Sequence, residues 1–199
     1  MPYGGRHEDP TEAQVRWQIA TSLAYGVTGL LYFEWHPMPD GHPGLVMSAH
    51  GRPTPGPQYF IAKRLNSWVL ALSPYLLGAK PTGVVDLRYD RDADPAAVLA
   101  GAPSAGQHLL VNTTRGDWTI GNFAVRSGRA GVPAVMVVNF EHAYTQWATV
   151  TWRGKVLEVD GVSGQRVPVR DDAPDIVGLQ LRFEPGQGRL FVADDNESK

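Results

Sequence analysis

The chain has 199 residues, of which 43% are hydrophobic and 19% are charged, a composition typical of globular proteins. Its 18 basic and 20 acidic residues give a formal net charge of −2, which argues against a basic surface for nucleic acid or for an anionic membrane. The absence of cysteine excludes disulfides, thiolate metal sites and a cysteine nucleophile. No apolar run reaches the about 20 residues of a membrane-spanning helix. No signal peptide is visible, and the sequence does not assign the protein to a compartment.

Two helices are predicted in the first third of the chain. In the first, Asp9 can cap the helix, Pro10 suits its first position and Glu12 completes a capping box. Apolar residues on most sides of this helix predict heavy burial, and Gly26 is a plausible C-terminal cap. A second helix is predicted from about Pro57 to Leu72, followed by one short turn.

Between these helices, Leu30–Trp35 is apolar on both faces, which is typical of a parallel strand covered by helices on both sides. A Pro- and Gly-rich loop from His36 to Gly56 follows, and loops of this length are more often functional than idle. A strand needs neighbours for its backbone hydrogen bonds, and the first third offers none. Either Leu30–Trp35 pairs with strands of the second part, or its sheet lies upstream of residue 1.

From about Thr82 onward, short strand-like runs recur every ten or so residues between turn signals, which predicts an antiparallel β-sandwich. The continuous apolar run from Ala134 to Val138 predicts a central strand. The nine predicted strands lie near Gly83–Tyr89, Gln107–Asn112, Trp118–Arg126, Ala134–Asn139, Ala148–Arg153, Val156–Val159, Val167–Arg170, Val177–Phe183 and Arg189–Ala193.

Several passages resemble a known enzyme family. The last helix–strand passage of (β/α)8-barrel glycoside hydrolases, above all β-galactosidase-like enzymes of the large retaining clan, is similar to Gln14–Gln18, Ser22–Gly29 and Leu31–Trp35. The final barrel helix and the loop before it are similar to Gly44–Val46, Gly51–Pro55, Tyr59 and Lys63–Asn66. The β-sandwich that often follows such barrels is similar to Val137–Asn139, Val159-Asp160, Gly164 and Pro185–Leu190.

The resemblance implies a fold class and a division of the chain. The fold class is an α/β fragment, the last helix–strand–helix of a TIM barrel, followed by an all-β antiparallel sandwich. Residues 1–81 would be the C-terminal remnant of the catalytic barrel, 82–194 the accessory sandwich domain and 195–199 a polar tail. Leu30–Trp35 would be barrel strand eight. The family's two catalytic carboxylates follow strands four and seven, and would therefore lie before Met1.

The implied parent reaction is retaining hydrolysis of O-glycosidic bonds in oligo- or polysaccharides, without a cofactor. The partners are a carbohydrate substrate and the missing N-terminal barrel portion, and we expect this chain alone to be inactive. The alternative belongs to another class of function. The sandwich would be a non-catalytic carbohydrate-binding or interaction module, with the helical third as an adaptor wrapped on it.

Three neighbouring residues are candidates for contact with substrate. Glu34 lies near the C-terminal end of the predicted strand, where barrel enzymes place their sites, and burial there would raise its pKa and suit acid/base work. It can equally be a supporting carboxylate paired with an arginine. Trp35 can stack on a sugar ring, as the family's aromatic platform does, or pack in the core. His36 can hydrogen-bond a sugar hydroxyl or remain a solvated loop residue.

Two further groups carry weaker signals. His36, Asp40, His42 and His50 are possible ligands for a divalent metal, but their spacing matches no motif and no metal is predicted. A second group, between two sandwich strands, forms either a sugar-binding edge or a polar hairpin with an aromatic packed beneath it; it comprises Glu141, His142, Tyr144 and Trp147.

Overall fold

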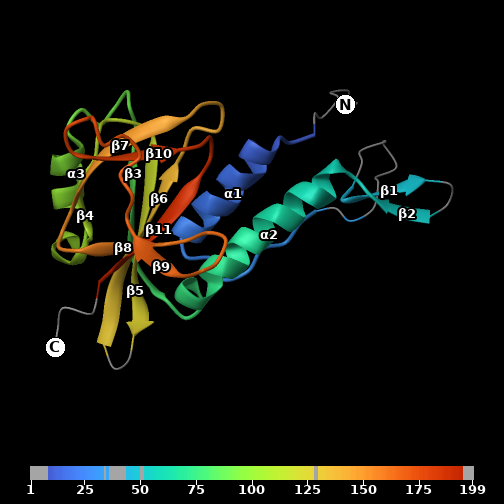
Figure 1. Cartoon of the computed structure of the whole chain (residues 1–199), viewed down its shortest axis with the longest axis horizontal. Helices are drawn as coiled ribbons and strands as arrows, with labels where there is room; N and C mark the ends of the chain where they lie inside the picture. The colour runs from blue at the N-terminus through green and yellow to red at the C-terminus, as the bar shows by residue number, and fades with distance from the viewer. Residues whose placement is uncertain (1–8, 34, 36–43, 50–51, 128–129, 195–199) are drawn as a thin grey trace, which may run out of the picture.

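A computed structural model describes residues 9–33, 35, 44–49, 52–127 and 130–194. A β-rich body carries a long helix that extends away from it, as Figure 1 shows. The helices are α1 (Glu12–Ala24), α2 (Pro57–Leu76) and α3 (Pro95–Gly101). The strands are β1 (Val46–Ala49), β2 (Arg52–Pro55), β3 (Lys80–Leu87), β4 (Leu110–Asn112), β5 (Trp118–Ser127), β6 (Ala130–Asn139), β7 (Gln146–Trp152), β8 (Val156–Val159), β9 (Arg166–Pro168), β10 (Leu179–Phe183) and β11 (Gly188–Ala193).

The strands form mostly antiparallel sheets, in agreement with the sheet-rich fold predicted for the second part. One sheet has six strands in the order β3-β5-β6-β11-β8-β9, and a second has three in the order β10-β7-β4. Strands β1 and β2 form a separate hairpin. The nine strands predicted after Thr82 correspond to β3–β11. Strand β6 lies between β5 and β11, so the central position predicted for Ala134–Val138 is confirmed.

The six-stranded sheet is buried on both faces, because successive residues of a strand point to opposite sides. Val135 and Val137 of β6 join a core shared with the three-stranded sheet, which we call the sandwich core. Met136 and Val138 of the same strand join a second core shared with α1 and α2, the helix-side core. Helices therefore cover the face of the large sheet that the small sheet does not.

Helix α1 approaches the large sheet closely because glycines remove side chains from the contact. A Cβ on Gly121 of β5 would lie 2.1 Å from the carbonyl oxygen of Ala24. Gly186, whose φ of +66° also favours glycine, faces Ala13 and Trp17 in the same way. The Arg16 guanidinium donates two hydrogen bonds to the carbonyl of Pro185. The helical third is thus fitted to the sandwich and does not merely lie beside it.

Several predicted boundaries need correction. The residue that caps α1 is Thr11 and not Asp9, because its hydroxyl accepts from the backbone of Gln14, whose side chain completes the capping box. Gly26 has a φ of +84° just after the helix, as its predicted capping role requires. Helix α2 continues through Pro74 to Leu76. No pattern predicted α3 or the β1–β2 hairpin, which falls within the expected loop.

The largest difference concerns the predicted strand Leu30–Trp35. Its described residues join none of the sheets, so the structure does not show the first of the two alternatives, in which the run pairs with strands of the second part. Among the described residues, no helix is both long enough and apolar enough to cross a membrane.

Candidate functional site

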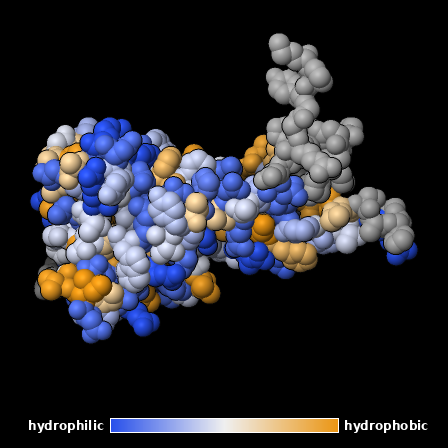
Figure 2. Space-filling model, turned by 90° about the horizontal axis from the view of Figure 1, so that it is seen from above, coloured by the Kyte–Doolittle hydropathy of each residue, from blue (hydrophilic) through white to orange (hydrophobic). Residues whose placement is uncertain are grey.

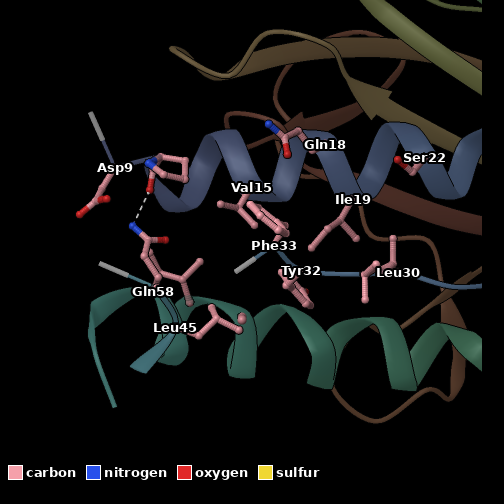
Figure 3. A pocket seen from close by; sticks show the side chains of 15 residues that line it. Asp9, Val15, Gln18, Ile19, Ser22, Leu30, Tyr32, Phe33, Leu45 and Gln58 are labelled. Atoms are coloured by element: carbon pink, nitrogen blue, oxygen red, sulfur yellow. Dashed lines mark hydrogen bonds between the residues drawn. The ribbon is translucent and has the colours of Figure 1, made fainter. Parts of the chain in front are cut away.

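The chain between α1 and α2 forms an extended segment, residues 27–33 and 35, that runs in the space between the two helices (Figure 3). Leu30 and Tyr32 pack against the helix-side core. Leu31 and Phe33 are 95% and 84% exposed. This two-residue alternation is the periodicity of a β-strand, although residues 28–33 pair with no described strand.

Few hydrogen bonds hold the extended segment. The Tyr32 hydroxyl donates to the Asn66 side chain of α2 at 2.8 Å, and the Val46 amide donates to the carbonyl of Trp35 at 3.0 Å. Residues 28–33 make no backbone hydrogen bond with another described residue. Within the described part of the chain, the backbone of this stretch is therefore unpaired on both edges.

Two grooves flank the extended segment. The α1-side groove has a volume of about 310 Å³, and Val15, Ile19 and Gln58 contribute to its wall (Figure 3). The α2-side groove has a volume of about 500 Å³ and contains Trp35 and Tyr59. Both volumes lie in the range of small-molecule sites, but both grooves are lined mainly by apolar side chains.

Trp35 is the predicted substrate-binding residue that the structure describes. It is 52% exposed in the α2-side groove, and its ring meets that of Tyr59 edge to face at a centroid distance of 6.4 Å. It is therefore not enclosed in a core in this chain. Lys63 and Asn66 line the same groove and offer hydrogen bonds to a ligand. The sequence reasoning missed Asn66 as a partner of Tyr32, since nothing in the local pattern relates the two.

The other predicted site residues cannot be placed. Glu34 and His36 lie outside the described residues, as do the possible metal ligands Asp40, His42 and His50. Within the described part of the chain, no group of three or more His, Asp or Glu side chains is placed to hold a metal ion.

The ion pair near the grooves joins α1 to α2 and is structural. Glu12 of α1 and Arg64 of α2 form an ion pair at 2.7 Å, and the hydrogen bond from Arg64 lowers the pKa of Glu12. Burial raises the pKa of Tyr32, so its hydroxyl stays protonated and continues to donate. Asp9 is the sole carboxylate among the described residues that line the two grooves. Retaining hydrolysis needs two carboxyl groups roughly 5 Å apart, and the described residues that line the grooves do not supply them.

The second predicted sugar-binding group lies at one end of the sandwich. Glu141 accepts a hydrogen bond from the backbone of Ala143 in its own loop, and the His142 ring contacts the Trp17 ring of α1. Tyr144 and Trp147 are 55% and 45% exposed. Trp147 therefore faces solvent and is not the aromatic packed beneath the hairpin.

No protein-family model, no curated protein and no solved structure matches this chain. The function is therefore argued from the residues and their arrangement.

Proposed function

We propose that this chain is the C-terminal part of a glycoside hydrolase that acts on O-glycosidic bonds of oligo- or polysaccharides. The observation that carries the proposal is the extended segment, whose Leu30 and Tyr32 pack against the helix-side core while Leu31 and Phe33 are largely exposed. In a (β/α)8 barrel, alternate residues of each strand face the outer helices and the barrel interior. A helix, an unpaired strand and a second helix fit the end of such a barrel.

The surface around the extended segment supports the same interpretation. Seven large apolar side chains there are at least 39% exposed, and Figure 2 shows hydrophobic residues along the narrow helical part of the molecule. They are Val27, Leu31, Phe33, Trp35, Phe60, Leu70 and Leu77. Apolar surface of this extent is uncommon on proteins that act alone and marks an interaction surface. The remaining strands and helices of a barrel would cover it.

The proposed division of labour follows from the residues present. The portion of the barrel that precedes this chain supplies the nucleophile and the acid/base carboxylate. Trp35 supplies an aromatic face for a sugar ring, next to the hydrogen-bonding side chains of Lys63 and Asn66. This chain alone therefore binds at most part of the substrate and does not hydrolyse it.

The test compares the 199-residue chain with a protein extended by the coding region upstream of Met1. The two proteins are assayed on a panel of chromogenic glycosides. We expect turnover by the extended protein and none by the shorter chain. In the extended protein, Phe33→Asp should abolish activity because it places a charge in the barrel interior, whereas Val177→Asp, on a side chain 94% exposed in the sandwich, should not. Turnover by the shorter chain, or an inactive extended protein, contradicts the proposal.

A second candidate is a self-contained carbohydrate-binding or interaction module. The close fit of α1 to the large sheet favours it, because the helical third folds onto the sandwich without a barrel. This candidate predicts that the extended segment is stably structured in the 199-residue chain. The glycosidase proposal predicts that the segment becomes structured only in the extended protein.

A further inference from the structure

One end of the sandwich brings three loops together. Leu87 at the end of β3 is paired with Trp118 at the start of β5, and Trp118 is paired with Asn139 at the end of β6. The loops that follow β3, precede β5 and follow β6 therefore leave the large sheet at the same end. They cover residues 88–94, 113–117 and 140–145.

Each side of this loop cluster presents an exposed aromatic side chain. Tyr89 follows β3, Tyr144 precedes β7, and Trp147 lies on the outward face of β7. They are 58%, 55% and 45% exposed, respectively. We call these three residues the aromatic platform. They come from segments that are far apart in the sequence, which is why no local motif identifies them.

Hydrogen bonds fix the backbone of every member of the aromatic platform. The Asp117 carboxylate accepts from the Tyr89 amide at 3.1 Å, and the Thr114 hydroxyl donates to the Trp147 carbonyl at 3.0 Å. The buried Asn139 side chain donates to the Tyr144 carbonyl, also at 3.1 Å. A surface that is held in place before binding loses less conformational entropy when a ligand binds.

Polar and charged side chains accompany the aromatic platform. The Arg115 guanidinium stands 4.4 Å from the Tyr89 ring centroid, and its Nε donates to the Tyr89 carbonyl. Partial loss of hydration and the negative charges of Glu141 and Asp117 raise the pKa of Tyr144, so that its hydroxyl remains a donor. Asp117 and Glu141 each accept a backbone amide with one carboxylate oxygen, and no described residue donates a hydrogen bond to the other oxygen.

We propose that the aromatic platform binds a neutral oligosaccharide chain. Sugar rings present C–H faces that pack on aromatic rings, together with hydroxyls that pair with carboxylates, guanidinium and phenol groups. The aromatic platform offers both kinds of contact, with charges of both signs and therefore no preference for an ionic ligand. A large continuous apolar patch, like the one around the extended segment, would instead mark a protein interface.

This inference goes beyond the proposed function because it needs neither the barrel nor hydrolysis. It also assigns residues to the binding site that the second candidate requires. If it fails, the activity of the extended protein is unaffected, so the failures of the two proposals can be told apart.

The test is affinity electrophoresis of the 199-residue chain in native gels that contain a soluble polysaccharide. Galactan, galactomannan, xyloglucan and pullulan cover four backbone chemistries. We expect at least one of them to retard the protein. Trp147→Ala and Tyr144→Ala should each weaken that retardation by roughly tenfold in apparent affinity, the size typical of removing a central aromatic contact. Tyr144→Phe keeps the ring and should lose less.

The matched control is Phe60→Ala, which removes an aromatic that is 49% exposed on α2 and lines neither groove. It should leave retardation unchanged, and circular dichroism should show that all variants remain folded. The proposal is overturned if none of the four polysaccharides retards the protein. It is also overturned if retardation survives both platform variants, or if Phe60→Ala weakens it equally.

Discussion

Two apolar runs of similar length differ in burial and in strand pairing. Ala134–Val138 lies in the middle of the six-stranded sheet, and each of its side chains is at most 2% exposed. Leu30–Trp35 is equally apolar, yet Leu31 and Phe33 are almost fully exposed and residues 28–33 pair with no described strand. A strand needs adjacent strands for its backbone hydrogen bonds, and its own sequence indicates only what surroundings suit its side chains. Ala134–Val138 has adjacent strands in the sandwich, whereas residues 28–33 have none among the described residues.

The largest expected effect lies in the sandwich core. Trp118 is fully buried against Phe183, with ring centroids 5.2 Å apart. Trp118→Ala should lower the free energy of unfolding by about 3–5 kcal/mol, because it removes buried area and leaves a cavity. Urea denaturation followed by circular dichroism measures this change. A loss below about 1 kcal/mol would mean that the sandwich core is not the main source of stability.

The contact between α1 and the large sheet should give the next largest effect. Gly121→Ala places a methyl group against the backbone of Ala24 and should cost about 1–3 kcal/mol through overpacking. Gly29→Ala is the control, because a Cβ there has no neighbour within 4 Å. Thermal unfolding of the two variants provides the comparison. Equal melting temperatures would show that α1 is not seated on the sheet in solution.

A buried histidine should make the sandwich sensitive to acid. His108 is 3% exposed, and burial, assisted by the charge of Arg153, lowers its pKa below the ordinary 6.5. Below pH 6.5 the unfolded chain therefore binds a proton that the folded chain resists, so stability falls as the pH drops toward the folded-state pKa. In His108→Leu, the slope of unfolding free energy against pH between 6.5 and 5 should be smaller. An unchanged slope would exclude His108 as its source.

The smallest effect is expected on the extended segment. Phe33→Ser should change the unfolding free energy of the 199-residue chain by less than about 0.5 kcal/mol, because the ring is already in water. The same substitution should reduce binding of a hydrophobic dye such as ANS. A destabilisation comparable to that of Trp118→Ala would place Phe33 in a packed environment and remove the contrast between the two regions.

Regular patterns predicted most of the fold. The nine strands after Thr82 and the central place of β6 follow from short apolar runs and turns, which are local signals. The prediction for Leu30–Trp35 expected burial on both faces, whereas the described residues alternate between packing against the helix-side core and exposure. The helix-side core was harder to predict, because α1 packs against Gly121 and Gly186, which are far from it in the sequence.

The candidate site residues also differ in whether the sequence could predict them. Trp35 was a candidate because the resemblance implies an aromatic platform at the end of strand eight, and Trp147 because it follows a polar stretch between two predicted strands. Tyr89 and Arg115 were not, because their relation to Tyr144 depends on strand pairing and on the hydrogen bond to Asp117. Local sequence specifies each loop separately, whereas a surface made of several loops appears only in the folded chain.

Hydrogen exchange across residues 30–33 tests the central claim most directly. In the 199-residue chain, the amides of these residues should exchange at nearly the rate of an unstructured peptide, while those of residues 134–138 stay protected. In the protein extended upstream, residues 30–33 should gain protection as neighbouring strands pair with them. Strong protection of residues 30–33 in the 199-residue chain would contradict the account and favour a self-contained module.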